Sequence, residues 1–224
     1  MTKPARRAHR RVDAEANDRA LLRAAHDVLA EDGAHASVAA IAARAGVGIG
    51  TLYRRYRTKS ELFQHLCAVS LDQWLAAAED GLAHDDPWEG LAHYVTTGVA
   101  LGSGSLGPIA GMIEITEEMA DKNTRSDAAA ALLVERAHAA GVLRSDVTVI
   151  DLHLLLEQLG RSPLLEQLGR QGRPDLVEAA RNSRARITAI ALDGLRAPAP
   201  RPLPGAPPGY ELFSERWEPP PPGT

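Results

Sequence analysis

The sequence is poor in the features that mark secreted and membrane proteins. Its 224 residues include one cysteine, Cys67, which cannot form a disulfide within the chain. No uninterrupted apolar run reaches about 18 residues, the length that suggests a membrane span. No charged-then-apolar leader with a cleavage site is visible. We therefore expect a cytoplasmic protein without a membrane partner, in which Cys67 packs as a small hydrophobic residue.

The patterns that mark most catalytic and metal sites are also missing. None of the eight histidines stands at a spacing typical of a zinc site. The glycine-rich segment 102–107 is followed by no lysine and preceded by no predicted strand, so it is not a phosphate-binding loop. No nucleophile and base form a recognisable pattern. We expect no catalytic residues, no metal and no cofactor.

Charge is distributed unevenly along the chain. Residues 1–60 contain 12 basic and 6 acidic residues and the rest contains 13 and 23, so the net charges are +6 and −10 within a total of −4. A basic segment on an acidic body is typical of a nucleic-acid-binding module joined to a second unit. The alternative is a solvated basic tail, which would attract phosphate only nonspecifically.

Apolar residues recur at the three- and four-residue spacing of amphipathic helices along most of the chain. Ser37 and Gly46 bound a short helix, and Thr58 with Glu61 predicts a capping box at the start of a longer one. No sustained strand alternation is present, so the predicted fold class is all-α. The predicted helices are 13–32, 38–45, 48–56, 58–80, 88–101, 109–120, 125–140, 149–159 and 175–195.

The C-terminal third contains a local duplication and a proline-rich end. Residues 155–161 recur as 164–170, and we interpret Ser162 and Pro163 between them as a helix break. Residues 197–224 hold ten of the 15 prolines and are predicted to be extended or disordered. Four residues could dock part of this segment on the body: Tyr210, Leu212, Phe213 and Trp217.

Residues 38–56 predict a helix-turn-helix. Ala42 supplies a small residue where two short helices would cross, and Gly46 supplies a left-handed turn. The residues that would face back to the helical bundle are Ile41, Ala45, Val47 and Leu52. The outward residues of the second helix, which would face a major groove, are Thr51, Tyr53, Arg54 and Arg55.

The following residues make the interpretation more specific. Residues 50–63 read Gly-Thr-Leu-Tyr-Arg-Arg-Tyr-Arg-Thr-Lys-Ser-Glu-Leu-Phe. This segment closely resembles the hallmark of the TetR family of tetracycline-repressor-like regulators, in which a recognition helix ends in an aromatic residue and a lysine opens the fourth helix. The resemblance covers about residues 15–66, and beyond them only the helical layout and the overall length agree.

The resemblance implies roles for individual residues. Thr51 and Arg54 would lie near bases or backbone in the groove, and Tyr53 and Lys59 would bind phosphates. Tyr56 would mainly be a packing residue, with its hydroxyl reaching solvent or DNA. The full predicted DNA-binding set is Ser37, Arg44, Gly50, Thr51, Tyr53, Arg54, Arg55 and Lys59.

Two positions depart from the family pattern. Gly48 stands where a serine or threonine commonly caps the recognition helix, and Ile49 replaces a common polar residue. A structural alternative exists for the outward set, because Tyr53 could be half-buried and the arginines could form a solvated face. Lys59 favours the DNA-binding interpretation. A lysine at a helix start is unfavourable to the helix dipole, and binding of an external anion would explain its presence.

The resemblance also implies a helical body that binds an effector and forms a homodimer through its last two long helices. The candidate interface residues are Leu152, Leu155, Leu156, Leu159, Ile187 and Ile190. The candidate pocket residues are Trp74, Trp88, Tyr94, Met112 and Met119. For both sets the alternative is ordinary packing in the core of the monomer.

The sequence thus predicts four segments: a basic flexible tail (1–12), a helix-turn-helix domain (13–58), an effector-binding and dimerisation domain (59–196) and a proline-rich tail (197–224). The predicted protein is a nucleoid-associated repressor that binds a palindromic double-stranded operator as a homodimer. An unknown small-molecule effector would release it. The alternative is a ligand-independent regulator or activator with the same DNA-reading helix.

Overall fold

The computed structural model describes residues 3–102, 106, 109, 112–161, 164, 167–168 and 171–209. Over these residues it is all-helical, as predicted, with one isolated bridge between Leu143 and Arg196 and no strand. No helix in this part of the chain has the length and apolar character of a membrane span. The elements are α1 (Lys3–Asp32), the 3₁₀ helix η1 (Gly33–His35), α2 (Val38–Ala45), α3 (Ile49–Arg55), α4 (Lys59–Leu82), α5 (Pro87–Leu101), α6 (Glu117–Ala139), α7 (Val149–Gly160) and α9 (Pro174–Leu195).

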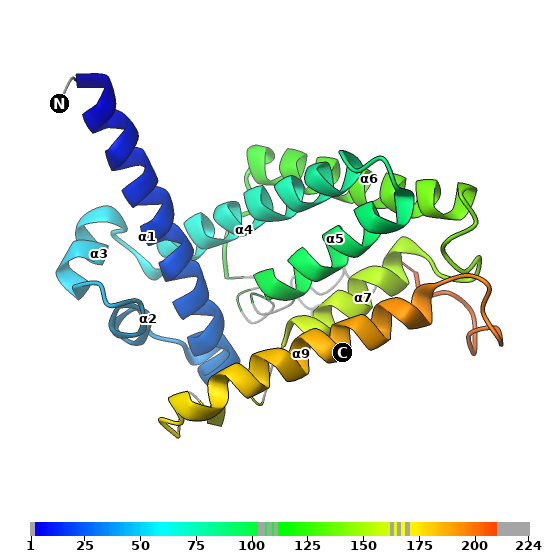
Figure 1. Ribbon diagram of the computed structural model, residues 1–224. Helices are drawn as coiled ribbons and strands as arrows, with labels where there is room; N and C mark the ends of the chain where they lie inside the picture. The colour runs from blue at the N-terminus through cyan, green and yellow to red at the C-terminus, as the bar shows by residue number, and fades with distance from the viewer. Residues whose placement is uncertain are drawn as a thin grey trace, which may run out of the picture.

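Figure 1 shows two regions joined by α4. The short helices α2 and α3 lie beside α1, and the start of α1 projects beyond them. We call α1 to α3 with the first two turns of α4 the reading unit. The rest of α4 and the helices after it form the body, in which α7 and α9 run along one side.

Helix α1 begins ten residues earlier than predicted, so the expectation of a flexible tail at 1–12 is wrong from Lys3 onward. Pro4 stands in the first turn, where a missing N–H costs no helical hydrogen bond. Alanine and arginine dominate the residues that follow, and both favour helix. The chain contains no glycine before Gly33, so nothing local stops the helix at residue 13.

The caps predicted for α2 and α4 are present, with one difference. Ser37 accepts a hydrogen bond from the Ala40 amide at 3.0 Å, and Gly46 ends α2 with a φ of 69°. Thr58 accepts from the Glu61 amide at 3.0 Å. The Glu61 carboxylate accepts from the Arg57 amide at 2.8 Å, one residue before the position expected in a capping box.

The two helices predicted at 109–120 and 125–140 are instead one helix, α6, which starts after the Thr116 cap. The polar residues 121–124 fall between the two predicted helices. They contain neither glycine nor proline, and the Thr124 hydroxyl donates to the Ala120 carbonyl within the helix at 2.9 Å. The described residues 112–116 form no helix, because the Met112 and Glu114 carbonyl oxygens accept hydrogen bonds from α4 instead.

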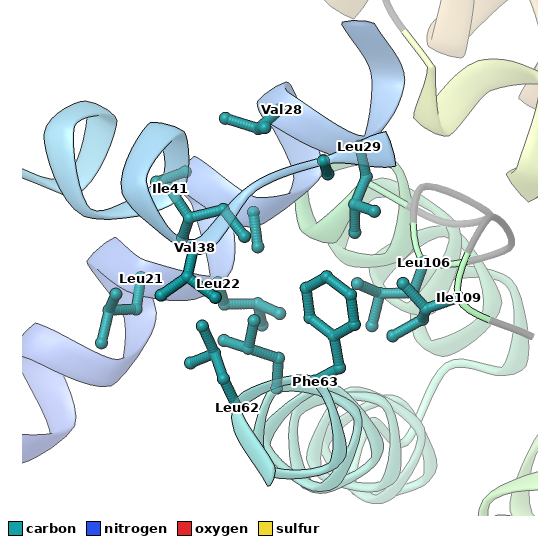
Figure 2. Packing of buried hydrophobic residues seen from close by; sticks show 14 of the residues in the cluster. Leu21, Leu22, Val28, Leu29, Val38, Ile41, Leu62, Phe63, Leu106 and Ile109 are labelled. Atoms are coloured by element: carbon teal, nitrogen blue, oxygen red, sulfur yellow. The ribbon is translucent and has the colours of Figure 1, made fainter. Parts of the chain in front are cut away.

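The buried residues form two clusters. The N-terminal core lies mainly in the reading unit and is completed by Leu106, Ile109 and Met119 of the body. Figure 2 shows Phe63 facing Leu106 and Ile109. This core includes Cys67, which is buried as predicted and whose pKa burial raises to about 11. The body core lies between α4, α5, α6 and α7. Because α4 contributes to both cores, the predicted boundary at residue 58 falls at a helix start and does not separate two cores.

Arg184 attaches α9 to the body. Its guanidinium donates to the carbonyl oxygens of Val99, Leu159 and Gly160, in the last turns of α5 and α7. These carbonyls lie at the C-terminal ends of the two helices, where the negative ends of the helix dipoles favour a cation. The arginine therefore fixes one face of α9 and leaves the other outward.

The described part of the proline-rich tail docks on the body through its backbone. The Leu203 amide donates to the Asp146 carboxylate at 2.7 Å, and Arg144 donates to the Arg201 carbonyl at 2.7 Å. Hydrogen bonds from Arg144 and Leu203 hold the pKa of Asp146 well below its usual range. The apolar residues proposed for docking, Tyr210, Leu212, Phe213 and Trp217, lie outside the described residues, as do Ser162 and Pro163.

Candidate nucleic-acid interface

Helix α3 presents a polar outer face and one buried residue. Leu52 is 2% exposed and packs in the N-terminal core, whereas Thr51, Tyr53 and Arg54 are exposed. The Arg54 guanidinium donates to the Thr51 hydroxyl at 3.2 Å, so these two side chains are neighbours on the outer face. The structure thus brings together the two residues predicted to read bases.

The start of the recognition helix is open. Gly48 occupies the cap position, and no side chain caps the helix there. Gly50 is exposed, and a Cβ atom at this position would meet no atom within 4 Å. Ile49 is also exposed, with 44% of its surface accessible. The weak cap expected from Gly48 is confirmed.

The predicted phosphate contacts Lys59 and Ser37 each stand at the start of a helix. Lys59 is the first residue of α4, and its ammonium group lies 5.2 Å from the centre of the buried Phe63 ring. Ser37 is exposed, but its hydroxyl oxygen already accepts the Ala40 amide. It can still donate its hydroxyl proton to an acceptor outside the protein.

Two arginines of the predicted set have partners inside the protein. Arg55 donates to both carboxylate oxygens of Asp18 in α1, at 2.6 and 3.0 Å, and these hydrogen bonds raise the pKa of the guanidinium. Arg44 lies 3.1 Å from Glu31 and 3.4 Å from Asp27, also in α1. The two arginines therefore join the ends of α3 and α2 to α1.

The sequence analysis missed these acids of α1. Asp18 is 37 residues from Arg55, and no periodicity within either helix relates them. The sequence does show arginines without neighbouring acids among the outward residues of α3. This pattern predicts contact with DNA as readily as it predicts an ion pair with a distant acid. The pairing depends on how α1 crosses α3, which a single sequence does not reveal.

Tyr56 packs as predicted, but its hydroxyl does not reach solvent. The residue is 8% exposed, and its hydroxyl oxygen is buried without a hydrogen-bond partner among the described residues. Burial raises the pKa of this phenol to about 12. The His65 ring lies 5.1 Å away, and its Nε2 atom is 3.4 Å from the Asp18 carboxylate. Tyr56 therefore contributes to the joint between α3 and α4 and not to an outer surface.

The five predicted pocket residues do not gather in one place. Trp74 and Tyr94 meet edge to face in the body core, with ring centres 5.8 Å apart. Trp88 is buried elsewhere in the body core, with the Arg196 guanidinium 4.2 Å from its ring centre. Met119 belongs to the N-terminal core, and Met112 is exposed beside the start of α4.

The sequence analysis missed the neighbours of Trp74 and Tyr94. The Tyr94 hydroxyl lies 3.5 Å from Nε2 of His153, whose pKa burial lowers although Asp127 opposes the shift. A Cβ atom on Gly98 would lie 2.5 Å from the Trp74 ring, so this ring packs directly on the α5 backbone. No group of three or more His, Cys, Asp or Glu side chains among the described residues could hold a metal ion.

The predicted dimer residues separate into two kinds. Leu152 and Leu156 are 1% exposed and belong to the body core, because this face of α7 packs against α5. They are therefore not free to form an interface. Leu155 and Leu159 are half-buried, while Ile187 and Ile190 on the outer face of α9 are 52% and 67% exposed.

Residues 21–66 match the model of the family described as bacterial regulatory proteins, tetR family. An HTH-type transcriptional regulator of Staphylococcus aureus is 37% identical over 81 residues, which is 35% of this chain and 42% of that protein. The match thus spans less than half of the curated relative.

Solved structures match over the greater part of the chain. A TetR transcriptional regulator from Streptomyces coelicolor is 26% identical, with a TM-score of 0.52 over 81% of this chain and 99% of that one. A TetR transcription regulatory protein from Mycobacterium vanbaalenii is 25% identical, with a TM-score of 0.51 over 84% and 99%. These relatives are named as regulators and not as enzymes, in agreement with the expectation from sequence. Residues 21–66 thus match the model of the tetR family of bacterial regulatory proteins, and the chain shares the fold of TetR regulators over most of its length.

Proposed function

We propose that the chain is a transcriptional repressor that binds a pseudo-palindromic operator as a homodimer and is released by a small-molecule effector. The observation that carries the proposal is the exposed pair Thr51 and Arg54 on α3, which is followed in the chain by Lys59 at the start of α4. Side chains on this outer face can reach base edges in a major groove, and a lysine at the rim can bind phosphate.

The individual DNA contacts remain those predicted, with a division of roles. Thr51 and Arg54 read bases, while Tyr53, Lys59 and the Ser37 hydroxyl bind the phosphate backbone. Arg44 and Arg55 hold α2 and α3 against α1 through their acidic partners, which offset the charge of the two guanidinium groups. Gly50 leaves room for DNA next to the backbone of α3.

The homodimer is proposed to form through α9. Ile187 and Ile190 give α9 an exposed apolar surface that the protomer does not bury. A two-fold axis along this face would pair α7 and α9 with their copies as a four-helix interface. The two recognition helices would then lie about 34–36 Å apart, one turn of DNA, which requires a pseudo-palindromic operator.

The effector is proposed to act by moving α4, whose first turns are hydrogen-bonded to the segment after α5. Ser60 donates to the Met112 carbonyl at 3.4 Å, and Gln64 donates to the Glu114 carbonyl at 2.9 Å. A ligand that separates Trp74 from Tyr94 would displace the far end of the same helix that carries Lys59. It would release DNA only if it binds the displaced state more tightly.

A ligand-independent regulator with the same reader is the second candidate. The observation that favours it is the close packing of the Trp74 ring on Gly98, which leaves no room for a ligand between them. Calorimetry against pooled metabolite fractions distinguishes the two candidates. Heat of binding together with loss of DNA binding supports the first, and the absence of both supports the second.

The test of the DNA-binding proposal is a gel shift across salt concentrations with operator DNA found by genomic footprinting. Lys59→Ala and Tyr53→Phe should weaken binding to all sequences, and Lys59→Ala should lower the salt slope by about 1. Arg54→Ala should cost about 1 to 3 kcal/mol at particular operator positions. The matched control is Arg125→Ala, an exposed arginine of α6 outside the reading unit, which should bind as the wild type does. Unchanged affinity in all three variants would contradict the site assignment.

The direction of regulation is tested separately. A reporter under the footprinted promoter should be less active when the protein is present, and a rise in its activity would identify an activator.

A further inference from the structure

The recognition helix carries an apolar side chain that the protein core does not use. Ile49, the first residue of α3, is 44% exposed, and Leu52 is the residue of this helix that is buried. Ile49 and Tyr53 are four residues apart, so they lie on the same side of α3. The isoleucine therefore lies beside Tyr53 at the edge of the outer face, between that face and the buried Leu52.

A single exposed apolar residue is common on protein surfaces and by itself indicates nothing. The residue after it provides a second, independent observation. Gly50 lies inside α3, where glycine is unfavourable compared with alanine. Its φ is not positive, and a Cβ atom would meet nothing within 4 Å. Neither the backbone conformation nor the packing of the protein requires glycine here.

The charge around these two residues indicates what could lie against them. No acidic residue occurs from Gly46 to Ser60, whereas Arg54, Arg55, Arg57 and Lys59 are basic. An apolar residue surrounded by basic and hydroxyl side chains fits a surface that is anionic at its rim and apolar at one point in its floor. In the DNA major groove the rim is phosphate, and the apolar group on the base pairs is the C5-methyl of thymine.

We propose that Ile49 contacts the C5-methyl group of an operator thymine, and that Gly50 lets the backbone of α3 approach closely enough for this contact. Ile49 is then a specificity-determining residue that selects thymine by burying its methyl group, in addition to the hydrogen-bonding readers Thr51 and Arg54. This inference rests on the proposed function, because it requires α3 to enter the major groove.

The experiment begins with selection of binding sequences from a random duplex library by the full-length protein. The most enriched duplex is then synthesised with deoxyuridine in place of each thymine in turn, which removes the methyl group alone. Affinities are measured by fluorescence anisotropy for the wild type, for Ile49→Ser and for Leu132→Ser. Leu132 is the matched control, since it is also 44% exposed but lies on α6.

For the wild type, deoxyuridine at one thymine of each half-site should weaken binding about fourfold per methyl group, the value expected for a buried methyl-sized group. Ile49→Ser should weaken binding to the thymine duplex by a similar factor. The affinity of this variant should then be the same for the deoxyuridine duplex as for the thymine duplex. Leu132→Ser should respond to deoxyuridine as the wild type does. Thermal melting of Ile49→Ser at the wild-type temperature shows that its folding is intact.

Two results would overturn the inference while leaving the proposed function in place. One is an enriched sequence for which the affinity of the protein is unchanged by every deoxyuridine substitution. The other is a deoxyuridine effect that persists at full size in Ile49→Ser, which would assign the methyl contact to another residue. Failure to enrich any sequence would instead reject the proposed function, and this inference with it.

Discussion

The reading unit holds its short helices with charge, whereas the body holds its long helices by close backbone approach. Arg55 and Arg44 join α3 and α2 to acids of α1 at the surface. In the body, a Cβ atom on Gly90 would lie 2.4 Å from the Gly81 carbonyl oxygen, so α4 and α5 touch backbone to backbone. An ion pair tolerates small movements, but a backbone contact between helices does not. The difference indicates that the orientation of the short helices can adjust in the reading unit, whereas the orientation of the long helices is fixed in the body.

The largest effect is expected where the body is tightest. Gly90→Ala would force α4 and α5 apart, because the atom it meets is a backbone carbonyl that cannot rotate away. We expect a loss of about 3 kcal/mol in the free energy of unfolding, at the upper end of the range for overpacking. Urea denaturation measures this loss. The matched control is Gly194→Ala in α9, where a Cβ atom meets nothing within 4 Å, and equal stability in the two variants would contradict the close contact.

A pH effect of similar size is expected in the reading unit. The Nε2 atom of His26 in α1 is buried without a hydrogen-bond partner among the described residues, and burial lowers the pKa of this histidine to about 4. The unfolded chain, with an ordinary pKa near 6.5, therefore binds the proton more readily. Stability is full above about pH 6.5 and falls as the pH approaches 4, by about 2 kcal/mol at pH 5.

Urea denaturation at pH 7.5 and at pH 5 measures this effect. His26→Gln should reduce the difference in unfolding free energy between the two pH values, whatever its effect at pH 7.5. The exposed His35 of η1 offers the control, since His35→Gln should keep the wild-type difference. A pH dependence that survives His26→Gln would place the acid sensitivity elsewhere in the molecule.

The contrast between the regions also explains what the sequence could predict. Helix boundaries in the reading unit depend on local signals, so Ser37, Gly46 and Thr58 locate α2 and the start of α4 to within one residue. The outer face of α3 follows in the same way from Leu52 as its buried residue. The pair of Arg55 with Asp18 depends on how distant helices cross, and no local pattern contains that information.

In the body, the sequence pattern allowed more than one use for the same residue type. Leu152 and Ile190 are both apolar residues at helical spacing, yet one is buried in the protomer and the other is 67% exposed. Burial within the core and burial between subunits require the same chemistry. The polar residues 121–124, which fall between two predicted helices, lie within α6, where Asp121, Asn123 and Thr124 are exposed to solvent.

A smaller effect is expected for the ion pair that holds α3. Asp18→Asn keeps the shape of the side chain but removes the charge that Arg55 binds. We expect a loss of about 1 kcal/mol in unfolding free energy, since the pair is bidentate but only partly shielded from water, and the loss should shrink at high salt. Affinity for the selected operator should fall as well, because the end of α3 is released.

Chemical denaturation at low and high salt checks this prediction, with anisotropy for the operator. The control is Asp72→Asn, which removes an exposed partner of Lys122 in the body and should cost almost nothing. A double-mutant cycle with Arg55→Gln isolates the coupling between the two side chains. A coupling energy near zero would mean that the pair does not hold the recognition helix.

The smallest expected change in stability has the opposite sign. Gly50→Ala replaces a helical glycine whose Cβ position is open, so the folded protein should gain about 0.5 to 1 kcal/mol. The same methyl group would stand between the α3 backbone and DNA, so operator affinity should fall although the protein is more stable. Urea denaturation and anisotropy on the same sample measure the two quantities. A variant that gains stability and binds as tightly as the wild type would show that the glycine gives no clearance to DNA. Because Gly90→Ala should lose stability through a contact inside the protein, the two substitutions together separate a glycine kept for packing from one kept for a partner.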